Sequence, residues 1–497
     1  MRRAVCALAA LIILALCAAP AWADPAPAGS GVAYEIFTGA FSDSDGDGTG
    51  DLEGIRARLD YIQALGVDMI WLTPIHPSPS YHHYDVTDYL AVAPEFGTVE
   101  GFEALAADCH DRGIRLIVDL VVNHTGVDHP WFKEAAAALA GGLESPYIDY
   151  YNFSQDSAAG HPVPGADGWY YEGRFGPHMP DLNLDSAAVR GEIASIIAFW
   201  QARGADGFRL DATTSYYTGA AQKNAAFIAW VTETARQTDP DCYIVGECWA
   251  DGPTILSLYE GGADSLFNFP LSDSGGVLVQ AALSGQGAAV ARVMASWHEA
   301  LCAVSSDIVD APFLTNHDQA RARGMLRSDM DAMKAAAMLY LLLPGRPFVY
   351  YGEELGLSGS GRDENKRQPM LWGGDAADTC APFPETDQKQ RLKEGVSEQD
   401  ADPDSLLNWY RQLIALRALA PELNGGPGLT ALETGYDGVC AFVRGDVAVL
   451  INVSRTETAA PDLSALNGFT EIGRVGGSGE WGILPPMSCC VMRRSPD

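Results

Sequence analysis

Residues 207–212 read GFRLDA, a short apolar run that carries an arginine and an aspartate two positions apart. Successive side chains of a β-strand alternate between its two faces, so Arg209 and Asp211 would share one face and the apolar side chains the other. If both faces are buried, two charged groups lose their water. This loss is costly in free energy unless the groups form an ion pair or take part in a functional site. A structural ion pair is one explanation of this stretch, and a catalytic site is the other.

Seven further short apolar runs lie on either side of this one. They are 32–37 (VAYEIF), 69–75 (MIWLTPI), 114–122 (IRLIVDLVV), 243–247 (YIVGE), 265–270 (SLFNFP), 311–316 (APFLTN) and 347–352 (PFVYYG). Helical patterns separate most of them, as at 52–65, 99–112, 187–203, 225–237 and 330–343. Eight apolar strands that alternate with helices are typical of a (β/α)8 barrel with a buried parallel sheet.

Two segments depart from this alternation. Residues 125–185 are rich in glycine, proline and aromatic residues and are too long for an ordinary strand-to-helix loop. We expect them to form an inserted subdomain between two parts of the barrel, 24–124 and 186–421. Residues 422–497 begin with turn residues and continue in alternating runs such as VCAFVRGDVAVLINVS, which predict a C-terminal antiparallel β-sandwich.

The first 23 residues, MRRAVCALAALIILALCAAPAWA, have a basic start, an apolar run and small residues at Ala21 and Ala23. This pattern predicts a signal peptide cleaved before Asp24, and the apolar run is short for a membrane span. We therefore expect a secreted or periplasmic protein without stable membrane insertion. Of the ten cysteines, Cys6 and Cys17 lie in this segment, and the others are scattered without metal-binding spacing. Export permits disulfides, but the sequence does not pair them.

The chain is strongly acidic, with 65 Asp and Glu residues against 32 Lys and Arg residues and a net charge of −33. This balance argues against nucleic acid and anionic membranes as partners, because both require a basic patch. Most of these carboxylates are expected on a solvated surface. We expect a monomer.

Polar residues gather where the predicted strands end. The working face of such a barrel lies at the carboxyl ends of its strands. The residues in question are Tyr84 and Asp85 after the second strand, Asn123 and His124 after the third, Arg209 and Asp211 at the fourth, Glu247 at the fifth, and His317 and Asp318 at the seventh. Like charges packed together oppose folding, so their convergence on one rim favours a catalytic site over a structural role.

Four of these strand ends also carry a resemblance. DLVVNH (119–124), GFRLDA (207–212), GECW (246–249) and FLTNHD (313–318) resemble, in order, the four signature regions of the α-amylase family of glycoside hydrolases. VDMIWLTPI (67–75), MPDLN (179–183) and GRPFVYYGEE (345–354) resemble three further segments of that family. The resemblance extends over essentially the whole chain from about residue 31.

The resemblance implies a role for each charged residue of the rim. Asp211 would be the nucleophile, Glu247 the acid and then the base, and Asp318 the carboxylate that stabilises the positively charged sugar. Two carboxylates about 5 Å apart are typical of the retaining mechanism, in which one is ionised while the other holds a proton. Arg209 beside Asp211 would keep the nucleophile ionised and oriented.

The resemblance also implies a set of substrate contacts. His124 and His317 would donate hydrogen bonds to hydroxyls of the sugar that is cleaved, and Tyr84 would offer its ring for stacking. Asp363 and Arg367, four apart in GRDENKRQPMLW, resemble a family pair that grips the same sugar. An ion pair within a loop is the alternative for these last two residues.

The stretch DSDGDGTGDLEG (43–54) places carboxylates at alternating positions with glycines between them. Oxygen ligands at this spacing suit Ca²⁺. The expected ligands are Asp43, Asp45, Asp47, Asp51 and the carbonyl of Thr49. A similar loop binds calcium structurally in oligo-1,6-glucosidase-like and neopullulanase-like members of the family. The alternative is a solvated turn rich in aspartate.

Specificity follows from a few positions only. Ala212 after the nucleophile resembles enzymes that cut α-1,4 links, and Trp249 could stack an aglycone sugar. MPDLN resembles exported α-amylases intermediate between the oligo-1,6-glucosidase and neopullulanase groups, whereas DATTSYY lacks the Lys-His pair of many amylases. We expect a retaining hydrolase of α-1,4 links in starch or maltooligosaccharides. An exo-acting α-glucosidase or a transglycosylase of the same family is the alternative.

Overall fold

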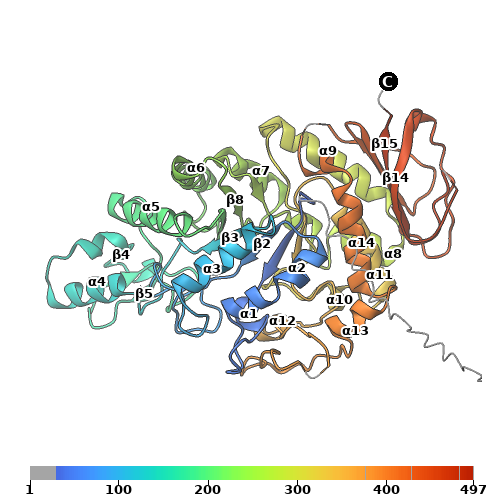
Figure 1. The fold of residues 1–497 in the computed structure, drawn as a ribbon. Helices are drawn as coiled ribbons and strands as arrows, with labels where there is room; N and C mark the ends of the chain where they lie inside the picture. Colours follow the sequence, from blue (N-terminus) through green and yellow to red (C-terminus); the bar gives the residue numbers. More distant parts are fainter. Residues whose placement is uncertain (1–28, 375, 427, 481, 496–497) are drawn as a thin grey trace, which may run out of the picture.

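The centre of the molecule is a parallel sheet (Figure 1). The computed structural model describes residues 29–495 except 375, 427 and 481, so the predicted signal peptide lies outside the described residues. The strands are β1 (Ala33–Ile36), β2 (Met69–Leu72), β3 (Arg115–Leu120), β7 (Gly207–Leu210), β8 (Tyr243–Gly246), β9 (Ser265–Leu266) and β10 (Phe348–Tyr350). Their order is β10-β1-β2-β3-β7-β8-β9.

The barrel closes between β9 and β10 through residues 311–313. This segment forms single parallel bridges, Phe267 with Ala311 and Phe313 with Phe348, where the sequence predicted a full strand. The predicted (β/α)8 barrel is confirmed, with its seventh strand reduced to these bridges. Aromatic side chains, among them Trp71, fill the interior at this closure, and together they form a buried cluster separate from the layer under the helices.

Most helices cover the outside of the sheet (Figure 1). They are α1 (Leu52–Ala57), α2 (Leu59–Leu65), α3 (Val99–His110), α5 (Ala187–Gln201), α6 (Ala221–Thr238), α7 (Gly252–Leu258), α8 (Val277–Ser284), α9 (Ala288–Val304), α10 (Ala322–Met325), α11 (Met330–Leu341), α12 (Asp363–Lys366), α13 (Val396–Ala401) and α14 (Leu406–Ala418). The single helix predicted over 52–65 is interrupted at Arg58. Its side chain pairs with Asp378 and lies 4.0 Å from the ring centre of Trp372.

The segment between β3 and α5 projects from one end of the molecule (Figure 1). It contains α4 (Pro130–Gly141) and a three-stranded antiparallel sheet in the order β4-β6-β5, formed by β4 (Phe153–Ser154), β5 (His161–Pro162) and β6 (Tyr170–Tyr171). Phe132 of α4 packs edge-on against Tyr171, with ring centres 4.9 Å apart. An aromatic cluster therefore holds this small unit together.

The C-terminal segment lies at the opposite end (Figure 1). It forms an antiparallel sheet in the order β11-β12-β13-β15-β14, with β11 (Thr430–Ala431), β12 (Val439–Arg444), β13 (Val447–Asn452), β14 (Phe469–Val475) and β15 (Ser488–Arg494). One face joins the core under the barrel helices, and the other packs on Leu463, Leu466 and Leu484 from the connecting segments. The predicted antiparallel structure is thus one sheet in the described residues, with helices and connecting segments as its covering layers.

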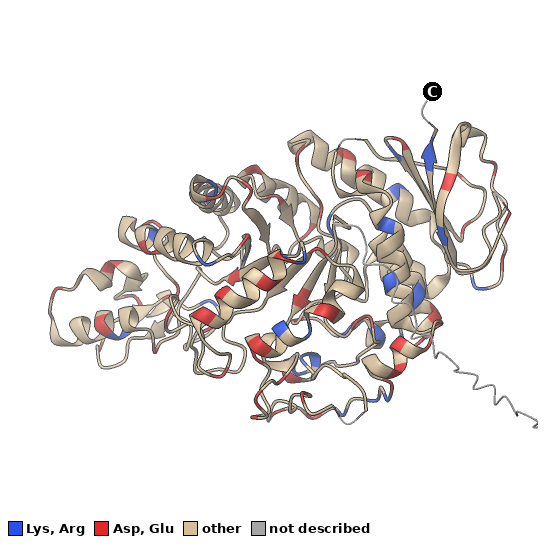
Figure 2. Cartoon of the chain, viewed as in Figure 1, with Lys and Arg blue, Asp and Glu red and all other residues tan. Residues whose placement is uncertain are grey.

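Acidic residues are distributed over the helices and loops around the barrel (Figure 2). None of the described helices is long and apolar enough to cross a bilayer. The cysteines of the described range are all unpaired, and only Cys302 among them is not buried. The adjacent Cys489 and Cys490 face opposite sides of β15, because neighbouring strand residues alternate.

Two adjacent glutamates are buried directly after β10. The Glu353 carboxylate accepts hydrogen bonds from the hydroxyls of Tyr340 at 2.7 Å, Tyr410 at 2.9 Å and Thr315 at 3.1 Å. Burial raises the pKa of Glu353 to about 7, although these hydrogen bonds favour the ionised form. The side chain therefore ties the strand to α11 and α14 at the cost of holding a carboxylate away from water.

We expect Glu353→Gln to stabilise the fold increasingly as pH rises from 5 to 8. The pKa of about 7 in the folded state exceeds the value of about 4.3 for an exposed glutamate. Stabilisation by the bound proton is therefore complete at low pH and is lost as pH rises through 7. Melting temperatures of both proteins across this range measure the effect.

The exposed Glu53→Gln on α1 is the control for replacing a glutamate by its amide. A melting-temperature difference for Glu353→Gln that is constant from pH 5 to 8 would contradict the expectation.

Candidate active site

A single buried guanidinium holds three carboxylates at the carboxyl end of the barrel. Arg209 Nη1 donates to Asp119 Oδ1 and to Asp211 Oδ1, both at 2.8 Å, and Nη2 lies 3.0 Å from Glu247 Oε2. The guanidinium also lies 5.0 Å from the ring centre of Trp71 inside the barrel. Arg209 and Asp211 of GFRLDA are therefore paired with each other. Asp211 shares Arg209 with Asp119 of β3 and with Glu247 at the end of β8.

The carboxylates around Arg209 resist ionisation. Burial raises the pKa of both Asp211 and Glu247, and Arg209 opposes the shift in each case. Burial likewise raises the pKa of Asp119 to about 7, again against the pull of Arg209. Burial therefore favours the protonated form of each carboxylate and Arg209 favours the ionised form, so that one carboxylate of the group can hold a proton while another is ionised.

The backbone turns sharply after Asp211 and fixes Glu247. Ala212 has a φ of 51°, in the left-handed region that a non-glycine residue rarely occupies. In this conformation its N–H donates to Glu247 Oε2 at 2.9 Å. The N–H of Thr213 donates to the carbonyl oxygen of Glu247 at 3.0 Å, so the ends of β7 and β8 are joined through backbone as well as side chains.

A second charged group centres on His317. Its Nδ1 lies 2.6 Å from Glu35 Oε1, and its Nε2 lies 3.2 Å from Asp318 Oδ2 and 2.8 Å from the hydroxyl of Tyr84. Arg367 Nη2 donates to the other oxygen of Asp318 at 2.8 Å. Burial opposes the charge on the imidazole, but Asp318 and Glu35 outweigh it and raise the pKa of His317 to about 10. Burial would also raise the pKa of Asp318, but His317 and Arg367 outweigh it and hold that pKa well below its usual range.

Tyr84 joins the two groups. Its hydroxyl donates to Asp119 Oδ2 at 2.9 Å and lies 2.8 Å from His317 Nε2. Its ring lies nearly parallel to that of His317, with ring centres 5.5 Å apart and 12° between the planes. The predicted stacking residue is thus part of the hydrogen-bond network.

The remaining predicted substrate residues lie at different depths. His124 is buried, with Nε2 3.1 Å from the carbonyl oxygen of Tyr84, and burial lowers its pKa to about 4. Trp249 is 52% exposed and stacks on Phe269 with ring centres 4.9 Å apart. The predicted pair Asp363 and Arg367 lies 3.7 Å apart, and Asp363 accepts a hydrogen bond from Lys366 at 2.8 Å. The shorter contact of Arg367 is with Asp318, which the sequence did not predict.

Asp119 and Glu35 were not among the predicted site residues. Each is a single carboxylate within an otherwise apolar strand, in IRLIVDLVV and VAYEIF. That is the same irregularity that distinguishes GFRLDA. In the barrel Asp119 pairs in register with Arg209 across β3 and β7, a juxtaposition that depends on strand order.

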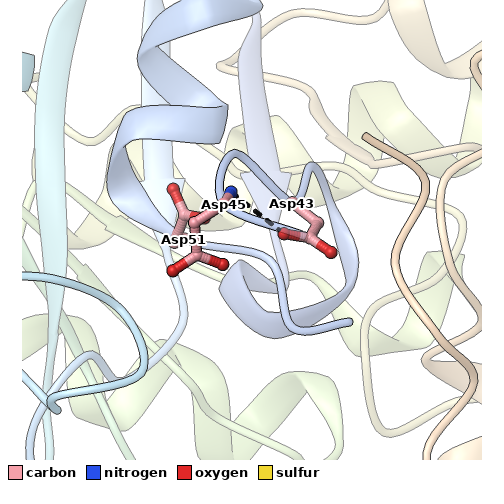
Figure 3. A group of neighbouring side chains, drawn as sticks. All are labelled: Asp43, Asp45 and Asp51. Carbon is pink, nitrogen blue, oxygen red and sulfur yellow. Dashed lines mark hydrogen bonds between the residues drawn. The ribbon is translucent and has the colours of Figure 1, made fainter. Parts of the chain in front are cut away.

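Three aspartates gather in the loop between β1 and α1 (Figure 3). Ligand oxygens of Asp43, Asp45 and Asp51 lie within 4.8 Å of one another and could hold a metal ion. Asp47, also predicted as a ligand, lies outside this group and accepts the N–H of Thr49 at 2.7 Å. Backbone N–H groups also bind the carboxylates, as when Asp51 Oδ2 accepts from Ser44 at 2.8 Å.

A long segment between α12 and α13 links this loop to the rim of the site. The N–H of Asp43 donates to the carbonyl of Asp378 at 3.0 Å, which anchors the segment to the aspartate loop. Further along, Phe383 packs against Tyr81 with ring centres 4.6 Å apart. The Tyr81 hydroxyl accepts a hydrogen bond from Arg367 at 2.8 Å. The aspartate loop and the Asp318 group are therefore connected by a continuous series of contacts.

Comparison with known proteins agrees with this architecture. Residues 35–426 match the family model described as alpha amylase, catalytic domain. The chain is 38% identical over 404 residues to alpha-amylase 3 of Dictyoglomus thermophilum, covering 79% of this chain and 78% of that protein. It is 29% identical over 473 residues to probable oligo-1,6-glucosidase 3 of Bacillus subtilis, covering 78% and 83%.

The solved structure of Eubacterium rectale Amy13B is similar over almost the full length. The TM-score is 0.90 and the identity 37%, with 95% of this chain and 98% of that chain covered. A family match over most of the sequence and a likeness in structure at this level of identity lead to one conclusion: the chain belongs to the α-amylase family of glycoside hydrolases.

Proposed function

We propose that the protein hydrolyses α-1,4-glucosidic bonds of starch or maltooligosaccharides with retention of configuration. The observation that carries the proposal is the division of the site into two charged groups. Arg209 holds Asp211 and Glu247 together in buried surroundings that raise their pKa values, whereas His317 and Arg367 hold Asp318 ionised. Glycosidic cleavage requires Glu247 to hold a proton while Asp211 and Asp318 are ionised. Burial favours the first condition, the contact with Arg209 favours the ionised Asp211, and His317 with Arg367 favours the ionised Asp318.

In the first step Asp211 attacks the anomeric carbon while Glu247 protonates the departing glycosidic oxygen. The C–O bond to the leaving sugar breaks as the bond to Asp211 forms, which yields a glycosyl-enzyme ester. In the second step Glu247 takes a proton from water, the resulting hydroxyl attacks the same carbon, and Asp211 is released as a carboxylate. Two inversions at one carbon give net retention.

The hydrogen bonds around each carboxylate assign these roles to particular oxygens. Arg209 occupies Oδ1 of Asp211, which leaves Oδ2 as the attacking atom. Arg209 and the N–H of Ala212 both contact Oε2 of Glu247, so Oε1 is the oxygen that carries and delivers the proton. Asp318, held ionised between His317 and Arg367, stabilises the positive charge that develops on the sugar.

The α-1,4 preference is supported by the relative named an alpha-amylase, by Ala212 after the nucleophile, and by the half-exposed Trp249 two residues beyond Glu247. The relative named an oligo-1,6-glucosidase supports the alternative of exo-acting glucosidase action, and a transglycosylase would use the same carboxylates. These activities differ in their products.

We further propose that the loop formed by residues 43–51 holds Ca²⁺. Asp43, Asp45 and Asp51 would supply carboxylate oxygens, with Asp47 and the Thr49 carbonyl completing the site as hard oxygen ligands. A bound ion would supply positive charge that neutralises the acidic loop and links it to the start of α1. We also propose that residues 1–23 direct export, so that the enzyme acts on glucans outside the cytoplasm.

The product profile tests the main proposal. On soluble starch we expect mixed short maltooligosaccharides whose new reducing ends are initially in the α configuration, with little action on isomaltose. The α anomer follows from two inversions at one carbon. Chromatography of the products and NMR of the fresh anomers provide the measurement.

Maltose, pullulan and a cyclodextrin extend the substrate panel. Glucose as the sole product would show that the protein is an exo-acting α-glucosidase instead. Products longer than the substrate would show that it is a transglycosylase. A β anomer in the first products would exclude the retaining mechanism.

Asp211→Asn should lower turnover of starch by more than about a thousandfold, because an amide cannot form the glycosyl ester. The control is Asp60→Asn on α2, whose side chain is 89% exposed, and it should leave turnover unchanged. Initial rates measure the effect, and unchanged circular dichroism shows that the fold is kept. Near-normal rates for Asp211→Asn would mean that another residue is the nucleophile.

Removal of divalent ions should lower the melting temperature, and added Ca²⁺ should restore it, because an ion that binds only the folded state stabilises it. Asp45→Asn should weaken this response. The matched control is Asp156→Asn, which alters an ordinary turn where the carboxylate accepts the N–H of Ala158, and its response should equal that of wild type. Equal melting temperatures of wild type with and without chelator would indicate a turn that binds no ion.

A further inference from the structure

Glu35 of β1 carries a buried carboxylate to which the proposed reaction assigns no role. Its side chain is 2% exposed and lies within the apolar run AYEI. Within the described residues its carboxylate hydrogen-bonds only His317, through Nδ1 at 2.6 Å and the backbone N–H at 3.3 Å. Glu353, by contrast, receives hydroxyls from three side chains. In the described residues the Glu35 carboxylate therefore has His317 as its hydrogen-bond partner.

The geometry points to Glu35 as a positioning residue that keeps His317 doubly protonated, so that its Nε2–H donates toward Asp318 and the bound sugar. This inference rests on the proposed glucan hydrolysis, and it assigns a function to a residue that touches neither the sugar nor the reacting atoms. Its action is transmitted entirely through the imidazole ring.

The two ring nitrogens of His317 show why the charge matters. A neutral imidazole carries one N–H, and Glu35 as acceptor would hold that proton on Nδ1. Nε2 would then present a lone pair to Asp318 Oδ2 at 3.2 Å, and both atoms would be acceptors. Only the imidazolium donates at both ends. While Glu35 accepts the Nδ1–H, the second proton is therefore what allows Nε2 to donate to Asp318.

His317 has two carboxylate counter-ions, Asp318 at Nε2 and Glu35 at Nδ1, and Glu35 is the one that no guanidinium contacts in the described residues. The titratable and charged groups that face it are Glu35 from β1, Tyr84 after β2, Asp119 from β3, Arg209 and Asp211 from the end of β7, Asp318 beside it, and Arg367 after α12. Arg209 engages Asp119 and Asp211, and Arg367 engages Asp318. The Glu35 carboxylate has no guanidinium hydrogen-bonded to it in the described residues.

The matched test compares Glu35→Gln with Glu353→Gln. Each replaces a buried carboxylate by its amide, but only the first removes the charge beside His317. We expect kcat/KM of Glu35→Gln on maltooligosaccharides to be within about twofold of wild type at pH 5, where a less basic imidazole is still protonated. The ratio to wild type should fall at least about tenfold by pH 8. Glu353→Gln should retain a constant ratio.

A second measurement does not depend on activity. In protein labelled at the histidine Cε1 carbon, the His317 signal is the one that a His317→Asn variant lacks, and its titration can be followed by NMR. The midpoint should fall by about three pH units or more in Glu35→Gln, which leaves the imidazole mostly neutral at pH 8, and stay unchanged in Glu353→Gln. Melting curves show whether Glu35→Gln remains folded; if it unfolds, the Glu35→Asp variant, which keeps the charge, should titrate like wild type.

The outcomes separate the two proposals. An unchanged His317 titration in folded Glu35→Gln overturns the role of Glu35, and so does a rate loss that is equal at pH 5 and pH 8. A wild type that cleaves no glucan overturns the proposed function, while the titration still decides whether Glu35 sets the charge of His317.

Discussion

The structure depends on one buried guanidinium. Arg209 is removed from water inside the barrel, yet it satisfies Asp119, Asp211 and Glu247 from three successive strands of the sheet. Without it, three carboxylates would face one another in surroundings that penalise charge, and the carboxyl end of the barrel would resist assembly. With it, each carboxylate is held at a fixed position before any substrate arrives. Such preorganisation is the main contribution that a rigid barrel can make to catalysis.

Three cations divide the acidic site into two parts with different pKa shifts. Arg209 is shared by carboxylates whose pKa values burial raises, whereas Asp318 receives His317 and Arg367 together and has a lowered pKa. Tyr84 lies between the parts and hydrogen-bonds to both. Similar side chains can thus serve as a proton donor and as a permanent charge, because their neighbours rather than their own chemistry differ.

Much of this arrangement could be predicted from the sequence, since strands with polar ends are visible as apolar runs followed by charged residues. The predicted strand at 311–316 forms only bridges and the helix at 52–65 is interrupted at Arg58, because contacts from distant segments override local pattern. Glu35 and Asp119 were missed for a related reason. A single carboxylate in an apolar strand shows that a partner must exist, but only strand order and register identify that partner.

The segment between α12 and α13 shows how such an enzyme can vary. It is fastened at one side to the aspartate loop through Asp378 and at the other to Asn365, whose amide donates to Asp387 at 2.8 Å, and between them it brings Phe383 to the rim. None of these anchors lies on a barrel strand. Mutations that lengthen or shorten this stretch can therefore reshape the rim of the site during evolution while the buried ionic centre is inherited intact.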